Sequence, residues 1–198
     1  MGSGCVYMIT FGYDLESTGP DPFENKIVTI QYRRNKENYV FKIWDYDQSE
    51  RELISRFLKS WESIPLHLSR GGDYFVMYNL RLCAPFLLTR CILNDIGKGD
   101  LEERKHLWNC LVHTPAFLDL YQLLGDKFTR FDHWRKLFGL GTSSFKNSDI
   151  PHLYNEKRYL EIEDYVCDEL VAMEKLYDTL SKESFFAELE KLRIKLDQ

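Results

Sequence analysis

The sequence predicts a single mixed α/β domain, and three observations support this fold class. With 198 residues, of which 44% are hydrophobic, the chain is long enough for one substantial core and too short for two. Three β-rich runs come first, followed by a helical run and then by alternating strand and helix patterns. Charged residues make up 29% of the chain, and no apolar run approaches the roughly 18 residues that span a bilayer. We therefore expect a soluble protein.

The first three predicted strands lie in the N-terminal quarter of the chain. Val6–Tyr13 and Ile27–Arg33 are β-rich, and the turn residues Gly19–Pro22 lie between them. Tyr39–Trp44 alternates large apolar residues with small or polar ones. Three consecutive strands at this spacing predict antiparallel pairing.

Helix signals and further strands follow. Ser49–Glu52 resembles a capping box, and apolar residues then recur at helical spacing until Pro65. We treat residues 1–198 as one domain and 181–198 as its C-terminal helical extension, which could pack on the domain or on a partner. The remaining predicted elements are a strand Tyr74–Tyr78, a helix near Pro85–Leu93, a strand Phe117–Tyr121 and a helical stretch from about Glu161 to Lys195.

The cysteines and histidines indicate no disulfide framework and no zinc site. The cysteines are odd in number and form no C-x-x-C pair, and the histidines show no ligand spacing. The first ten residues do not resemble a signal peptide, so we expect an intracellular, cytoplasmic protein. The residues concerned are Cys5, Cys83, Cys91, Cys110 and Cys167, with His67, His106, His113, His133 and His152.

Two carboxylates mark the first candidate site. Asp14 and Glu16 lie two residues apart at the end of the first predicted strand, so strand geometry turns both side chains to one face. Such a pair can share a divalent metal ion, although D-x-E pairs are common on solvated surfaces.

The string Phe11–Gly19 followed by Ile27–Tyr32 resembles the first motif of the DEDD superfamily of 3′–5′ exonucleases. The similarity is strongest to the proofreading domain of family B DNA polymerases. The resemblance implies a ribonuclease H-like fold with a five-stranded mixed sheet in the order 3-2-1-4-5, flanked by helices. It also implies that Asp14 bridges two metal ions, Mg²⁺ or Mn²⁺, and that Glu16 holds one of them.

The second motif resembles the family pattern except at its carboxylate. Tyr74–Asn79 and Pro85–Leu87 match, and Asn79 is expected to contact the nucleic acid. Aligned on Pro85–Leu87, Cys83 takes the place of the metal-binding Asp; aligned on Asn79, that place falls on Ala84. Neither alignment supplies a carboxylate, and thiols are poor ligands for Mg²⁺.

The third motif of the tyrosine branch is Tyr-x-x-x-Asp, which here reads Tyr165-x-x-x-Glu169. The two side chains lie one helical turn apart on the same face. By the resemblance, Tyr165 orients the attacking water and Glu169 binds metal. A shifted register would offer Asp164 and Asp168, without the tyrosine, and a merely polar helix face remains an alternative.

Basic residues are the expected contacts to single-stranded nucleic acid, despite a net charge of −5. Those after residue 127 fall where the family lines its strand channel, and we select Arg130, Arg135 and Lys146. Two functions stay open: an exonuclease with weak or lost catalysis because Cys83 replaces a carboxylate, and a non-catalytic nucleic-acid-binding module or partner subunit. An unrelated α/β protein with surface acids is the third interpretation.

Overall fold

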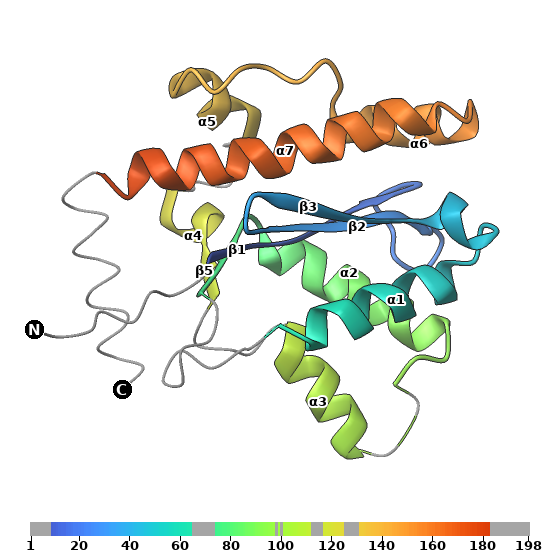
Figure 1. Ribbon diagram of the computed structural model, residues 1–198. Coiled ribbons are helices and arrows are strands. Elements are labelled where there is room, and N and C mark those ends of the chain that lie inside the picture. Colours follow the sequence, from blue (N-terminus) through green and yellow to red (C-terminus); the bar gives the residue numbers. More distant parts are fainter. Residues whose placement is uncertain are drawn as a thin grey trace, which may run out of the picture.

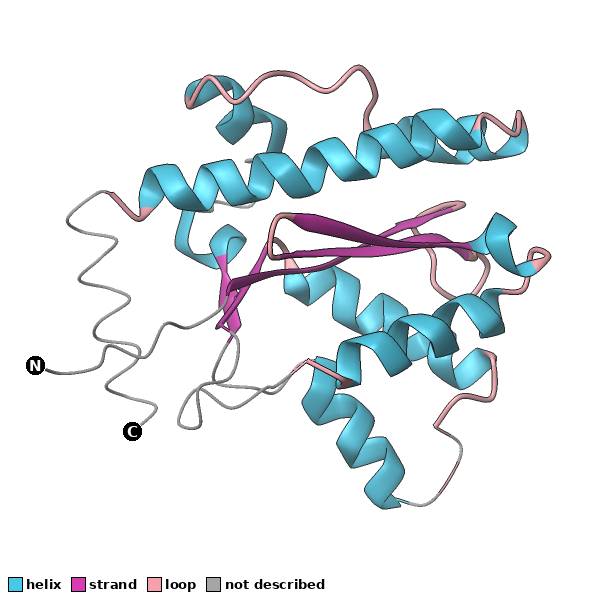
Figure 2. Ribbon diagram, viewed as in Figure 1, coloured by secondary structure: helices cyan, strands magenta, loops and turns pink. Residues whose placement is uncertain are grey.

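The computed structural model describes residues 9–64, 74–97, 99, 101–111, 117–124 and 131–182, which form an α/β fold around one mixed sheet (Figures 1 and 2). The five strands run in the order β3-β2-β1-β4-β5. The first three pair antiparallel, and β4 and β5 join them in parallel. The elements are β1 (Ile9–Ser17), β2 (Ile27–Arg34), β3 (Glu37–Lys42), η1 (Ile43–Tyr46), α1 (Glu50–Glu62), β4 (Tyr74–Met77), α2 (Leu80–Leu93), α3 (Leu101–Leu111), β5 (Phe117–Asp119), α4 (Leu120–Leu124), α5 (Phe131–Leu137), η3 (Asn147–Asp149), α6 (Ile150–Asn155) and α7 (Tyr159–Leu180).

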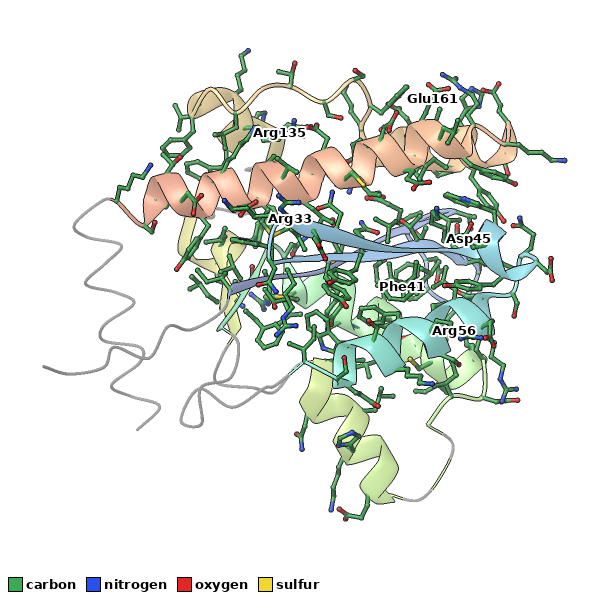
Figure 3. All side chains as sticks on the ribbon, viewed as in Figure 1. Arg33, Phe41, Asp45, Arg56, Arg135 and Glu161 are labelled. Atoms are coloured by element: carbon green, nitrogen blue, oxygen red, sulfur yellow. The ribbon has the colours of Figure 1, made fainter. Side chains whose placement is uncertain are left out.

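Helices cover both faces of the sheet. Helices α1 and α2 lie on one face, and the long helix α7 runs along the other (Figure 1). The α1 face is aromatic: Tyr13 of β1 packs edge-on against Phe57 and Trp61 of α1. The α7 face is more polar, since Arg33 of β2 forms an ion pair with Glu174 of α7 at 2.6 Å (Figure 3).

An irregularity in β1 decides which of its side chains face α7. The pairing with β2 shifts between Phe11 and Asp14, as at a β-bulge. Phe11 packs on Tyr177 of α7, and three residues later Asp14 also faces α7, which a regular strand would not allow. Gly12 lies in this irregular stretch, where an added Cβ would come within 1.5 Å of the Met77 sulfur.

A buried ion pair fastens the β1–β2 loop to the helices on the α1 face. The Glu50 carboxylate accepts the Ile27 backbone N–H at 2.7 Å and the Arg90 Nε–H at 2.8 Å, and the Asn94 amide donates to it at 2.9 Å. Arg90 also donates to the Pro22 carbonyl at 3.0 Å. Both charged groups are buried, so their mutual bonds offset the cost of desolvation.

The predicted sheet order and antiparallel N-terminal strands are confirmed. Several boundaries differ. The strand β1 continues to Ser17, so the two acidic residues lie within the strand and not after it. The helix α2 begins at Leu80, five residues before Pro85. The predicted strand Phe117–Tyr121 ends at Asp119, where α4 begins, and none of α3, α4, α5 and α6 was predicted. The proposed extension 181–198 lies outside the described residues from 183 onward.

Candidate metal centre

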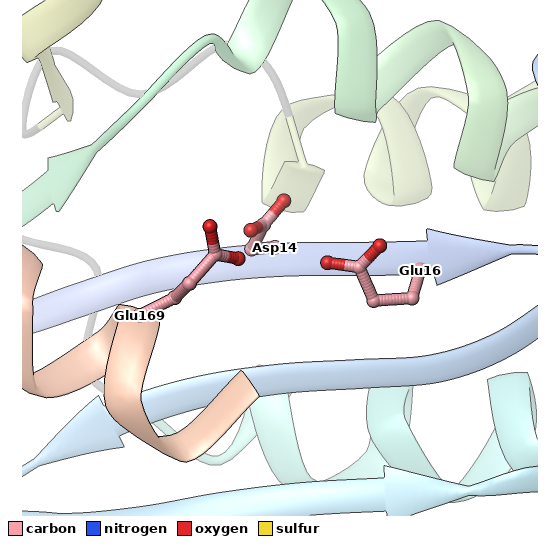
Figure 4. Close-up of side chains that lie close together, drawn as sticks. All are labelled: Asp14, Glu16 and Glu169. Carbon is pink, nitrogen blue, oxygen red and sulfur yellow. The ribbon is translucent and has the colours of Figure 1, made fainter. Parts of the chain in front are cut away.

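Three carboxylates from distant parts of the sequence converge at one point between the sheet and α7. Asp14 and Glu16 project from β1, and Glu169 reaches toward them from α7 (Figure 4). One oxygen from each residue lies within 4.8 Å of the other two. The distance is short enough for all three groups to ligate one divalent cation.

Burial makes this carboxylate cluster electrostatically costly in the absence of a cation. Glu16 is 3% exposed and Glu169 is 8% exposed. Burial raises the pKa of Glu16 well above its usual value, and the charges of Glu169 and Asp14 add to the rise. Burial also raises the pKa of Glu169 to about 8, Asp14 adds to this, and the Tyr165 hydrogen bond opposes it.

Two buried oxygens of the cluster have no hydrogen-bond partner among the described residues: Glu16 Oε1 and Glu169 Oε2. A buried acceptor without a partner costs about 1–3 kcal/mol, and more when it is charged. A hard divalent cation prefers carboxylate oxygens of this kind, so the residues present fit Mg²⁺ or Mn²⁺.

Cys83 lies beside the cluster on the second turn of α2. Its thiol donates to Asp14 Oδ1 at 3.3 Å, and the Leu15 backbone N–H donates to the same oxygen at 2.9 Å. Burial raises the pKa of Cys83, and the negative charge of Asp14 raises it further. Without a bound cation the Cys83 side chain is therefore a protonated hydrogen-bond donor to Asp14. Ala84, from the other alignment, is also buried, but it has no ligating atom.

The hydroxyl of Tyr165 stands next to Glu169 and is anchored by Asn147. Tyr165 is buried and donates a hydrogen bond to the Asn147 side-chain oxygen. Burial raises the pKa of Tyr165, and the charge of Glu169 raises it further, so the hydroxyl stays protonated. In the alternative register, Asp164 is exposed and Asp168 points away from the cluster to Arg135. The structure therefore brings together the side chains of the Tyr165/Glu169 register.

The basic residues selected for nucleic-acid contact have different environments. Lys146 is exposed, next to the residue that anchors Tyr165. Arg135 is 1% exposed and lies between α5 and α7, where it pairs with Asp168 at 2.7 Å (Figure 3). In this conformation Arg135 packs as a buried link between the two helices, and its positive charge lowers the pKa of Glu169. Arg130 lies outside the described residues.

Asp119 positions the start of α2, a role that sequence reasoning did not assign. Its carboxylate accepts the backbone N–H of Asn79 at 2.8 Å and that of Leu80 at 3.0 Å. Asn79 has a left-handed backbone (φ 62°) and is half-buried at the end of β4. Asp119 is the last residue of β5 and lies forty residues after Asn79, so the parallel pairing of β4 with β5 brings the two together.

Comparison with known proteins identifies no family. No protein-family model matches the chain, and no curated protein matches it significantly. Among the helices that the structure describes, none is both long and apolar enough to cross a bilayer. The function is therefore inferred from the chemistry of the site itself.

Proposed function

We propose that this chain is a metal-dependent 3′–5′ exonuclease-like protein with a ribonuclease H-like fold and a degenerate active site. The observation that carries the proposal is the convergence of Asp14 and Glu16 with Glu169, which follows them by about 150 residues in the sequence. Beside them, the Cys83 thiol donates a hydrogen bond to Asp14. The sheet order 3-2-1-4-5, with its first three strands antiparallel, supports the same assignment. Two of the three acids are buried, which argues against the alternative of an unrelated α/β protein whose acids lie on the surface.

The expected reaction is hydrolysis of the terminal phosphodiester at the 3′ end of a single strand. A divalent ion held by the three carboxylates would lower the pKa of a bound water and stabilise charge on the phosphate. Tyr165, kept protonated and anchored by Asn147, is suited to orient a water by hydrogen bonding. Next to Asn147, the exposed side chain of Lys146 can contact the phosphates of a bound nucleic acid.

Cys83 limits the chemistry that the site supports. In a two-ion mechanism each ion needs carboxylate or phosphate oxygens. A protonated thiol at the position of the missing carboxylate leaves the second ion without that ligand, so we expect weak catalysis that favours Mn²⁺. This substitution also favours the second candidate function, a nucleic-acid-binding module or partner subunit that has lost hydrolysis.

Trimming of a labelled oligonucleotide distinguishes the two functions. The purified protein is incubated with a 5′-labelled single strand and either Mg²⁺ or Mn²⁺, and shortening from the 3′ end is followed on a denaturing gel. We expect slow shortening with Mn²⁺ that Asp14→Ala abolishes. Asp164→Ala, which removes an exposed carboxylate of α7 outside the cluster, is the matched control and should keep wild-type activity.

The opposite result would also be informative. If the wild type and Asp14→Ala are equally inactive while both are folded, hydrolysis is excluded. Single-strand binding that persists in both proteins would then establish the binding-module function.

A further inference from the structure

Two polar residues of β2 lie on the same face of the sheet as the carboxylate cluster. In the antiparallel ladder Gln31 pairs with Asp14, and Thr29 pairs with Glu16. Residues that pair in this way point to the same side of a sheet, with Cβ atoms about 4.5–5.5 Å apart. Arg33, two residues from Gln31 on the same strand, bonds to Glu174 of α7, which shows that this side is the α7 side.

Both side chains are fully buried, and within the described part of the chain their polar atoms have no hydrogen-bond partners. Gln31 and Thr29 are each 0% exposed. Neither the amide nitrogen nor the amide oxygen of Gln31 has a hydrogen-bond partner among the described residues, and the same is true of the Thr29 hydroxyl oxygen. Buried polar groups in native proteins are normally satisfied, so an unsatisfied one indicates a bound water, a bound ion or a functional role.

The unpartnered atoms around the cluster are chemically complementary. Gln31 brings one donor group, Nε2, and one acceptor, Oε1, while Glu16 and Glu169 each keep an unpartnered carboxylate oxygen. The amide N–H₂ can donate to such an oxygen, and the amide and hydroxyl oxygens can ligate a cation or accept from its bound water. An apolar neighbour at position 31 would offer neither interaction.

We propose that Gln31 and Thr29 are part of the ion site, completing an oxygen-lined cage for one hard divalent cation of the Mg²⁺ or Mn²⁺ class. This inference rests on the proposed function, and it adds two neutral oxygen donors from β2 to the three carboxylates. The cage thereby joins β1, β2 and α7 around one cation. This cage provides all the ligands of the first ion site, although Cys83 weakens the second ion site.

The test is Mn²⁺ affinity, measured by electron paramagnetic resonance or calorimetry on the full chain. Gln31→Leu should weaken Mn²⁺ binding by about ten to a hundredfold, and Thr29→Val by a smaller factor, as is typical for residues supporting a metal site. Tyr32→Phe is the control: it removes a hydroxyl that bonds Ser60 on the opposite face of the same strand, and it should leave Mn²⁺ affinity unchanged.

Stability in excess chelator separates an ion-site role from a merely structural one. Replacing an unsatisfied buried amide with an apolar side chain is neutral or stabilising, so metal-free Gln31→Leu should be as stable as the wild type or more so. A structural amide would instead make the metal-free variant less stable. Gln31→Met, which is unbranched and similar in length, serves if the leucine variant does not fold.

Wild-type Mn²⁺ affinity in both Gln31→Leu and Gln31→Met would overturn the inference, while trimming by the wild type would still support the proposed function. If Mn²⁺ binding depends on Gln31 but the wild type does not trim the oligonucleotide, the result would contradict hydrolysis and still support the role of Gln31 in the ion site. A wild type that binds no Mn²⁺ would overturn both.

Discussion

Without a bound cation, the protein should become less stable as pH rises from about 5 to above 8. The native pKa of Glu169 is raised from its ordinary 4.5 to about 8, because the carboxyl is buried and faces the charge of Asp14. Between these values the native state holds a proton that the unfolded state has lost, so the free energy of unfolding falls with rising pH. The pKa values of Glu16 and Asp14 are also raised, which strengthens the trend.

The structure sets a ceiling for the contribution of Glu169. A rise in pKa from 4.5 to about 8 corresponds to about 5 kcal/mol, at about 1.4 kcal/mol for each factor of ten in acid dissociation. Relaxation and water entry reduce such penalties, so we expect roughly 2 to 3 kcal/mol from this residue.

The assay is urea unfolding in chelator at several pH values between 5 and 9, with and without Mn²⁺. Glu169→Gln should match the wild type near pH 5 and exceed its stability at pH 8.5, since it removes one buried charge. Mn²⁺ should stabilise the wild type more than the variant, because a cation that binds the native state stabilises it and the variant lacks one of the three carboxylates. Asp164→Asn, at an exposed position on the same helix, is the control. A wild type whose metal-free stability is flat or increases over this range would refute the reasoning.

Three further predictions concern other parts of the molecule. Cys83→Asp supplies the missing oxygen ligand and should raise Mg²⁺-dependent 3′ trimming, and Glu169→Asp should increase trimming further only when Cys83→Asp is also present. If the double mutant is as inactive as Asp14→Ala, the missing ligand is not the cause of the weak activity. Glu50→Ala removes the carboxylate that pairs with the buried Arg90 and should lower the free energy of unfolding in urea by about 3–5 kcal/mol. Glu52→Ala, whose ion pair with Arg56 is exposed, should lower it by only about 0.5 kcal/mol. Similar losses in the two variants would contradict a stabilising role for the buried pair. Binding of a single nucleic-acid strand should be weak, because a few exposed cations such as Lys146 have to offset a net charge of −5. Binding should weaken further as salt screens these charges. Titration of a labelled single strand at two salt concentrations tests this, and equal affinities would exclude an electrostatic channel.

Local patterns were sufficient to predict the three antiparallel N-terminal strands and the face on which each acidic pair lies, whereas the order of the sheet was implied by the family resemblance. The turn residues Gly19–Pro22 and the alternation in the first strands indicate antiparallel pairing, and the spacings of Asp14 with Glu16 and of Tyr165 with Glu169 place each pair on one face. These properties depend on residues within a few positions of each other, so the sequence displays them directly.

Contacts between distant segments could not be predicted in this way. The bulge that turns Asp14 toward α7 lies in the stretch where the Met77 side chain of β4 packs against Gly12. The start of α2 depends on Asp119, and the burial of Arg135 depends on the packing of α5 against α7. In each case a contact with a distant segment determines the local structure, and the residues of the segment itself do not indicate that contact.

Anomalous diffraction from crystals grown with Mn²⁺ tests the central claim most directly. We predict an anomalous peak within coordination distance, about 2.0–2.6 Å, of oxygens from Asp14, Glu16 and Glu169. Crystals of Asp14→Ala grown under the same conditions should lack this peak. Well-ordered wild-type crystals that show manganese only at other positions, or none at all, would contradict the assignment of a metal centre to this cluster.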